Sequence, residues 1–127
     1  MLQIDLGSPV PVYGQIVAGI RAALVDAKFE PGDQLPTVRE LALALGVNHN
    51  TVAEAYRILA AEGWLDLRQG RGATVLDRPR PTAKPEEQER FARRVDELVI
   101  EAIAFGLPPR TIADELDAAG RKALSRR

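Results

Sequence analysis

Length, composition and charge describe a small globular protein. The 127 residues allow one ordinary domain with an appendage, and a chain with 46% hydrophobic and 28% charged residues has the composition of a folded protein. Cysteine is absent, which excludes disulfides, thiol nucleophiles and thiolate metal sites. No apolar run approaches the roughly 18 residues that cross a bilayer, and no secretory signal is visible at the start. We therefore expect a cytoplasmic protein without membrane contact.

The distribution of charge does not by itself favour nucleic-acid binding. Residues 1–76 contain six Lys or Arg against eight Asp or Glu, a net charge of −2, and residues 77–127 have a net charge of +1. Nucleic-acid-binding modules usually show a basic excess. Because salt screens exposed charges beyond about 8 Å, the placement of a few cations matters more than the total. Only a specific sequence pattern can outweigh this composition.

Apolar periodicity predicts a first helix that begins at Pro11 and ends near Lys28. Its apolar positions recur at helical spacing: Val12, Ile16, Ile20 and Leu24. The segment Glu30-Pro31-Gly32-Asp33 follows and is a strong turn signal. After it, Gln34-Leu35-Pro36 is too short for more than a fragment of a strand.

Capping residues then delimit two short helices. Thr37 and Glu40 have the spacing of a capping box, and Gly46 is suited to end the helix that they begin. Asn48 is a good N-cap for a third helix, which we expect to end at Gly63. The expected buried positions of the two helices are Val38, Leu41, Ala42 and Leu45, and then Val52, Ala55, Tyr56 and Leu59. Two short helices joined by a glycine-containing turn form a helix-turn-helix.

A β-hairpin is predicted directly after the third helix. Residues 64–68 and 73–76 are short runs of strand-forming residues, and the glycines of Gln69-Gly70-Arg71-Gly72 can adopt the positive φ of a tight turn. A helix-turn-helix followed by such a hairpin is a winged helix. We assign residues 1–77 to this domain, and we expect Tyr56 and Trp64 to belong to its core.

A linker and a helical tail complete the chain. Residues 78–85 contain three prolines and predict a stiff extended linker before a tail of residues 86–127. Two helices are predicted there, separated by Gly106-Leu107-Pro108. Their expected contact residues are Phe91, Val95, Leu98, Val99, Ala102 and Ile103, and then Ile112 and Leu116, followed by Ala119 and Leu124. A tail of this size is too small for a core of its own, so we expect it to form a homodimer. The expected fold class is mostly α with a small β-hairpin.

Residues 9–76 resemble the GntR family of bacterial repressors. The matching segments follow one another in the family's order and spacing: Pro11-Val12-Tyr13, Gln15-Ile16, Pro31 to Pro36, Val38 to Ala42, Leu45-Gly46-Val47, Asn50-Thr51-Val52, Glu62-Gly63 and Arg68 to Gly72. The forms Pro36-Thr37-Val38-Arg39 and Asn48 to Val52, with a tail of about 40 residues, are similar to the YtrA-like subfamily, in which two tail helices dimerise. In larger relatives the C-terminal domain binds a small effector. This tail is too short to enclose a comparable pocket, and whether an effector exists is left open.

The resemblance implies roles for residues at matching positions. Arg39 corresponds to an arginine that contacts a phosphate or a base edge, Asn48 to Thr51 to the start of the recognition helix in the major groove, and Gln69 to Gly72 to the wing in the minor groove. Many relatives carry arginines where this sequence has His49 and Ala53, so the family's base preference is not carried over.

The chemistry of the residues is consistent with these roles. Asn50 and Thr51 offer short donors and acceptors to bases or phosphates, and a wing arginine is favoured by the negative potential of the minor groove. The candidate DNA-binding residues are Arg39, Asn48, His49, Asn50, Thr51, Arg57, Arg68, Gln69, Gly70, Arg71 and Gly72. For Arg39, the competing interpretation is a solvated charge paired with Glu40 or Asp33. Arg57 could equally be a solvent-exposed charge.

The sequence thus predicts a transcription regulator, a dimeric repressor that binds double-stranded DNA at an inverted repeat. An enzyme is not expected, because one histidine, no cysteine and scattered carboxylates give no nucleophile with a base. No metal or cofactor is expected either. The alternative is a protein-interaction module that uses a winged helix without binding DNA. Such a module should expose large apolar residues around Arg39, His49 and Asn50, where a DNA-binding surface should be basic and polar.

Overall fold

The computed structural model describes residues 2–68, 72–78 and 81–126, and the chain divides into two compact units, Met1–Pro79 and Arg80–Arg127. The first unit contains α1 (Val12–Val25), β1 (Gln34–Leu35), α2 (Val38–Leu45), α3 (His49–Ala61), β2 (Leu65–Arg68) and β3 (Gly72–Val75). The second unit contains α4 (Pro85–Ala104) and α5 (Pro109–Ser125). The order of elements is that of a winged helix followed by a two-helix tail, and the predicted fold class is confirmed.

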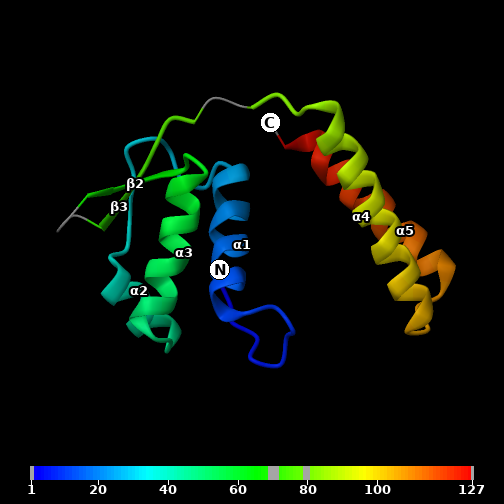
Figure 1. Cartoon of the computed structure of the whole chain (residues 1–127), viewed down its shortest axis with the longest axis horizontal. Helices are drawn as coiled ribbons and strands as arrows, with labels where there is room; N and C mark the ends of the chain where they lie inside the picture. The colour runs from blue at the N-terminus through cyan, green and yellow to red at the C-terminus, as the bar shows by residue number, and fades with distance from the viewer. Residues whose placement is uncertain (1, 69–71, 79–80, 127) are drawn as a thin grey trace. The chain divides into compact units, whose positions relative to one another are not determined.

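The core of the first unit lies around α3, which packs against α1, α2 and β2 (Figure 1). The four apolar positions predicted for α3 are all buried, and so are Ile16, Ile20 and Leu24 of α1. On α2 only Ala42 is fully buried, while its neighbours Val38, Leu41 and Leu45 are half-buried against the same core. The helical periodicity of the sequence therefore identified the faces that pack together.

The first helix ends three residues before the predicted boundary at Lys28. Its last helical residue is Val25, and Ala27 adopts a left-handed conformation with φ of 57°. The N–H of Lys28 donates to the carbonyl of Ala23 at 2.9 Å, and the N–H of Ala27 donates to that of Leu24 at 3.2 Å. These two bonds form a Schellman motif, which usually has glycine at the left-handed position. Alanine stands there instead, so no glycine marks the end of the helix in the sequence.

The fragment at Gln34 and Leu35 becomes a strand of the sheet. β1 pairs antiparallel with β3, with Gln34 opposite Thr74 and Leu35 opposite Ala73, and β3 pairs in turn with β2. The wing hairpin of β2 and β3 is therefore extended by β1 to a three-stranded sheet in the order β1-β3-β2, with β3 in the centre. Leu35 is buried in the core, and this burial explains why two residues suffice.

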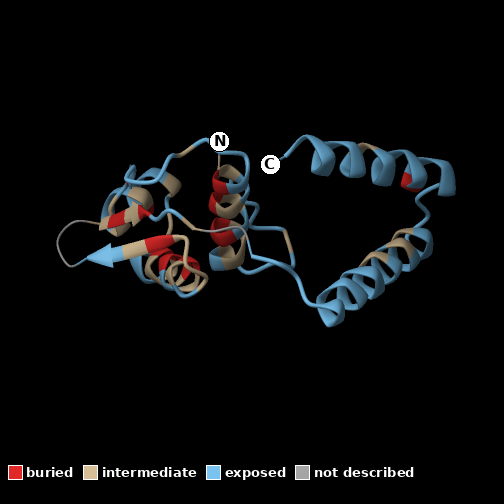
Figure 2. Ribbon diagram, turned by 90° about the horizontal axis from the view of Figure 1, so that it is seen from above, coloured by how far each residue is buried: buried red, intermediate tan, exposed pale blue. Residues whose placement is uncertain are grey.

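The second unit consists of α4 and α5, which pack against each other. Both helices begin with proline in the first turn, where its missing N–H is not needed, and Glu86 and Glu87 lie favourably at the positive end of α4. Among the described residues of this unit, only Ile112 is buried (Figure 2). The sequence also predicts that α5 buries Leu116, Ala119 and Leu124, and this prediction is wrong within one chain, since all three are exposed.

Candidate nucleic-acid interface

Local capping interactions fix the relation of α2 to α3. The hydroxyl of Thr37 accepts from the N–H of Glu40 at 3.1 Å, and the Glu40 carboxylate accepts from the N–H of Thr37 at 2.9 Å. Hydrogen bonds from the backbone and the hydroxyl of Thr37 lower the pKa of Glu40 below its usual value. Gly46 ends α2 with φ of 70°, in the left-handed region that glycine tolerates. The predicted capping box and helix stop are both confirmed.

The first turn of α3 is exposed to solvent. Asn48 caps the helix, because its side-chain oxygen accepts from the N–H of Asn50 at 2.8 Å. The side chains of His49 and Asn50 are exposed, and Thr51 is half-exposed. Asn48 therefore has a structural role that uses one of its polar atoms, whereas Asn50 and His49 are available to a ligand.

Three arginines surround one open depression between α2, α3 and the sheet. The depression has a volume of about 790 Å³. Its lining residues are Thr37, Val38, Arg39, Ala53, Tyr56, Arg57, Leu67, Arg68 and Gly72. The arginines come from three different elements, which sequence spacing alone could not bring together. This concave surface brings together three arginines of a unit whose sequence carries a net negative charge.

The three arginines differ in their carboxylate partners. Arg57 pairs with Glu54 at 2.5 Å, and Arg68 pairs with Asp66 at 2.9 Å. Neither of the pairings considered for Arg39 is formed, because Glu40 is engaged in the capping box and Asp33 accepts from the N–H of Glu30. Among the residues that the structure describes, Arg39 is thus the cation of this depression without an ion pair.

Tyr56 ties α3 to the segment that leads into α2. Its ring is buried, and its hydroxyl donates to the carbonyl of Pro36 at 2.6 Å. Burial, with a smaller contribution from the charge of Glu40, raises the pKa of Tyr56 to about 12, so the hydroxyl stays neutral. Tyr56 therefore holds the start of α2, and with it Arg39, at a fixed place beside α3. The core role expected for Tyr56 is confirmed.

The wing is described in its two strands. Gly72 lies close to Thr37, since a Cβ on Gly72 would meet the Cα of Thr37 at 3.4 Å, and its φ of 70° also favours glycine. These contacts give Gly72 a packing role at the edge of the depression. The candidate residues Gln69, Gly70 and Arg71 lie outside the described residues.

A polar cluster at the base of the wing was not anticipated from the sequence. The Glu62 carboxylate accepts from Nε of Arg21 at 3.1 Å and from the indole N–H of Trp64 at 3.1 Å. Arg78 lies over the Trp64 ring at 4.3 Å and donates to the carbonyl of Glu62 at 2.9 Å. Trp64 is therefore half-buried and not a full core residue. The cluster joins α1, the end of α3 and the segment that leaves the sheet.

Comparison with known proteins places this geometry in a family. Residues 12–75 match the family described as bacterial regulatory proteins, gntR family. The chain belongs to this family. The HTH-type transcriptional repressor YtrA of Bacillus subtilis (strain 168) is 34% identical to this gntR-family regulator over 107 residues, which span 84% of this chain and 82% of that protein.

Solved structures share the fold. YtrA from Sulfolobus acidocaldarius, a GntR-family transcription factor, is similar with a TM-score of 0.57 and 33% identity, over 94% of this chain and 97% of that chain. The DNA-binding domain AraR(DBD) in complex with operator ORX1 is similar with a TM-score of 0.54 and 29% identity, over 58% of this chain and 95% of that chain. The resemblance inferred from sequence motifs is thus confirmed.

The predicted contact residues of the tail of this gntR-family regulator lie on both of its helices. Phe91, Leu98 and Ile103 of α4 and Leu116 of α5 are exposed, whereas Val95, Val99 and Ala102 are half-buried. Ile112 is covered within the unit. Within the described ranges, no cluster of potential metal ligands is found, and no helix is long and apolar enough to span a membrane.

Proposed function

We propose that this gntR-family regulator is a dimeric, sequence-specific repressor that binds an inverted-repeat DNA operator. The observation that carries the proposal is the depression lined by Arg39, Arg57 and Arg68 beside the exposed first turn of α3. Arginines from several elements can neutralise successive phosphates, while the polar first turn of α3 reads base edges. The repressor role is supported by the name of the Bacillus relative, and operator binding by the AraR complex.

In this proposal each part of the chain has one task. Residues 1–77 bind DNA, with α3 in the major groove and the wing in the minor groove, residues 78–85 form a linker, and residues 86–127 dimerise. A two-fold dimer places two copies of α3 in successive major grooves, which are about 34–36 Å apart along the duplex. Footprinting of an operator selected from a random DNA pool should show two inverted half-sites with this spacing or a multiple of it. A single asymmetric site would contradict the dimeric part of the proposal.

The base-reading part is tested by changing Asn50→Ala. Loss of a base contact should weaken operator binding by about 1–3 kcal/mol and random DNA binding much less. Gel-shift titrations at fixed salt measure both affinities. Gln3→Ala, which removes an exposed amide outside the depression, serves as the control. Equal losses on operator and random DNA would show that Asn50 contacts the phosphate backbone and not a base.

A protein-interaction module is the second candidate function, and Leu43 favours it. This α2 residue is 79% exposed and borders the same surface as Arg39 and His49. Leu43 shares an open hollow with Arg39 and His49 and with Val38 and Val47, which are half-buried. One exposed leucine is a small apolar area for a protein interface, so we favour DNA. Retention on heparin together with a gel shift supports DNA binding. A protein that is not retained on heparin and does not shift DNA would support the interaction module.

A further inference from the structure

One large apolar side chain is left in solvent beside the exposed first turn of α3. Leu43 of α2 is 79% exposed, and among the large apolar side chains of α2 and α3, both described in full, it is the only exposed one. The others pack in or against the core of the first unit. The packing of this unit therefore does not explain a leucine at this position, whereas a contact with another molecule would.

Leu43 lies on the face of α2 that carries Arg39. The two residues are four positions apart, so their side chains share one face of the helix, about 6 Å apart along its axis. The residues directly before them, Val38 and Ala42, pack toward the core. Because Arg39 is a candidate DNA contact, Leu43 belongs to the same proposed surface.

An open hollow connects this face of α2 to the start of α3. It has a volume of about 530 Å³, and its lining includes Arg39, Leu43, Val47 and His49. Val47 is half-buried and contributes a further apolar side chain to the hollow. The hollow thus combines apolar side chains with two of the candidate DNA contacts.

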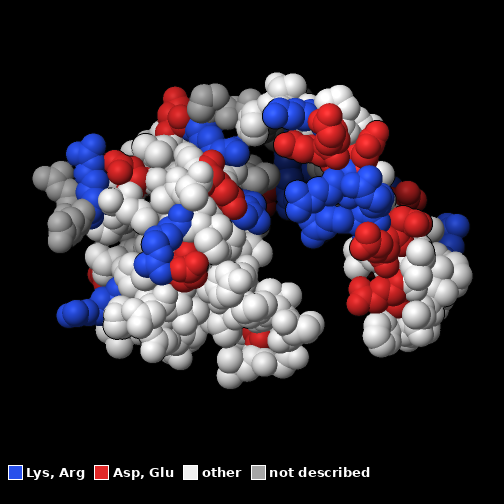
Figure 3. All heavy atoms as spheres, in the orientation of Figure 1, with Lys and Arg blue, Asp and Glu red and all other residues white. Residues whose placement is uncertain are grey.

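The surface around this hollow is poor in charge. Residues 41–53 contain no Lys, Arg, Asp or Glu, although 28% of the whole chain is charged. On the visible face of the first unit, the region of α2 and the start of α3, at the lower left, is accordingly mainly uncharged (Figure 3). Phosphates are bound chiefly by cations, whereas base edges are recognised by hydrogen bonds and apolar contacts. A surface of this kind therefore suits base edges, while the arginines of the neighbouring depression suit phosphates.

The chemistry of the major groove restricts what an exposed leucine can contact there. Each base pair presents hydrogen-bond donors and acceptors in this groove, and the apolar group among them is the 5-methyl group of thymine. A leucine pressed against a donor or an acceptor leaves that group without a partner, which weakens binding. A leucine against the methyl group buries apolar surface on both sides, which strengthens binding. A T·A pair is therefore the best match for Leu43.

We infer that Leu43 is a specificity-determining residue, which selects a thymine in each half-site through the 5-methyl group of that base. This inference rests on the proposed function and adds to it an apolar base contact from α2, beside the polar contact proposed for Asn50 of α3. The same contact accounts for the exposure of Leu43 in the absence of DNA.

Replacement of thymine by uracil tests the methyl contact with the full chain. Uracil pairs with adenine as thymine does but lacks the 5-methyl group. In an operator selected from a random DNA pool, each thymine is replaced in turn, and gel shifts at fixed salt measure the dissociation constant. Loss of one buried methyl group should raise this constant about fourfold at one position of a half-site, and about 15-fold when both half-sites are changed. An operator on which no uracil weakens binding would overturn the inference.

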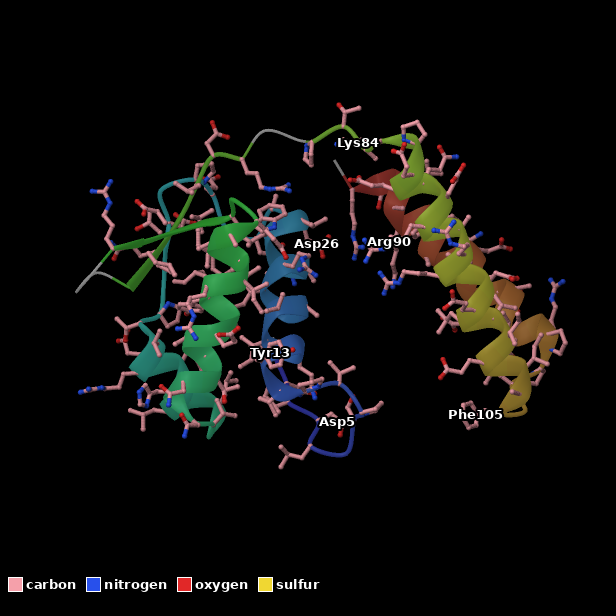
Figure 4. All side chains as sticks on the ribbon, in the orientation of Figure 1. Asp5, Tyr13, Asp26, Lys84, Arg90 and Phe105 are labelled. Carbon is pink, nitrogen blue, oxygen red and sulfur yellow. The ribbon has the colours of Figure 1, made fainter. Side chains whose placement is uncertain are left out.

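Variants of Leu43 assign the contact to this side chain. Leu43→Ala should bind the thymine and the uracil operator equally at the sensitive position, whereas Leu43→Met, which keeps a long apolar side chain, should retain the difference. Leu6→Ala is the matched control, because Leu6 is 84% exposed and does not line the hollow. Figure 4 shows its neighbour Asp5 in the loop before α1, on the other side of α3 from α2. This control should keep the wild-type response to uracil.

The outcomes separate this inference from the proposed function. A wild-type chain that selects no operator from the pool would overturn both. A chain that binds its operator, but whose thymine-to-uracil difference persists in full in Leu43→Ala, would overturn the role of Leu43 alone. Denaturant unfolding of Leu43→Ala should match that of the wild type, because the side chain is exposed, so a change in affinity reports the contact with DNA and not a change in the fold.

Discussion

The two units of the chain solve the problem of apolar burial in different ways. The winged helix places Tyr56, Leu59 and Val52 at about 1% exposure or less, whereas the described part of the tail buries only Ile112 (Figure 2). A helix that leaves Phe91 and Leu98 in water gains little from folding alone, since burial of apolar surface is the main source of stability. The difference teaches that the first unit carries its own core, while the tail leaves apolar surface exposed, as the proposed dimer requires.

The largest expected effect comes from removing the tail. A shortened chain of residues 1–84 should keep the fold of the first unit but sediment as a monomer. The two DNA-binding units are then no longer linked and bind the two half-sites independently, so operator affinity should fall by about 10²- to 10⁴-fold. Circular dichroism, sedimentation and gel shifts on the same sample measure the three properties. A shortened chain that is still dimeric would place the interface in the first unit and break the comparison.

A pair of leucine substitutions compares the two units directly. Leu59→Ala removes a fully buried side chain and should lower the free energy of unfolding by about 2–5 kcal/mol in denaturant titrations. Leu98→Ala should change this free energy in the dissociated chain by less than about 0.5 kcal/mol and weaken the dimer. Leu43→Ala, at an exposed position, is the control for both. A loss of stability from Leu98→Ala as large as that from Leu59→Ala would show that the tail has a core of its own.

The smallest expected effect is the pH dependence of the α2 cap. The pKa of Glu40 is lowered in the folded chain, so the carboxylate stabilises the fold above its usual pKa of 4.5, and this contribution is lost as pH falls through the lowered value. The stability difference between the wild type and Glu40→Gln should therefore be largest near neutral pH and shrink below about pH 4.5. Thermal unfolding across this range measures it.

Thr37 provides the control for the cap. Thr37→Ala should cost about 1 kcal/mol and remove only the smaller part of the pH-dependent difference, because the hydroxyl is lost while the backbone N–H, the larger cause of the lowered pKa of Glu40, remains, whereas Thr37→Ser should keep both. A pH dependence that survives in Thr37→Ala to the full extent would show that the backbone N–H alone lowers the pKa of Glu40.

The sequence by itself determined the parts of the fold that depend on local chemistry. The capping box at Thr37 and Glu40, the stop at Gly46 and the cap at Asn48 were all predicted, because each uses residues within four positions of one another. Apolar spacing also identified the buried face of α3. The family motifs depend on these same local patterns, and they were recognised for that reason.

Only the tertiary structure decided the features that join distant segments. Gln34-Leu35 predicted no more than a fragment of a strand, and it is part of a sheet because β3 lies beside it. Arg39, Arg57 and Arg68 meet around one depression because α2, α3 and the sheet pack together. The polar cluster around Glu62 likewise depends on the packing of α1 against the end of α3. The end of α1 depends on Ala27, whose left-handed conformation has no signal in the sequence. Contacts between segments far apart along the chain have no counterpart in local propensity. For this reason the arginine-lined depression of an acidic unit became visible only in three dimensions.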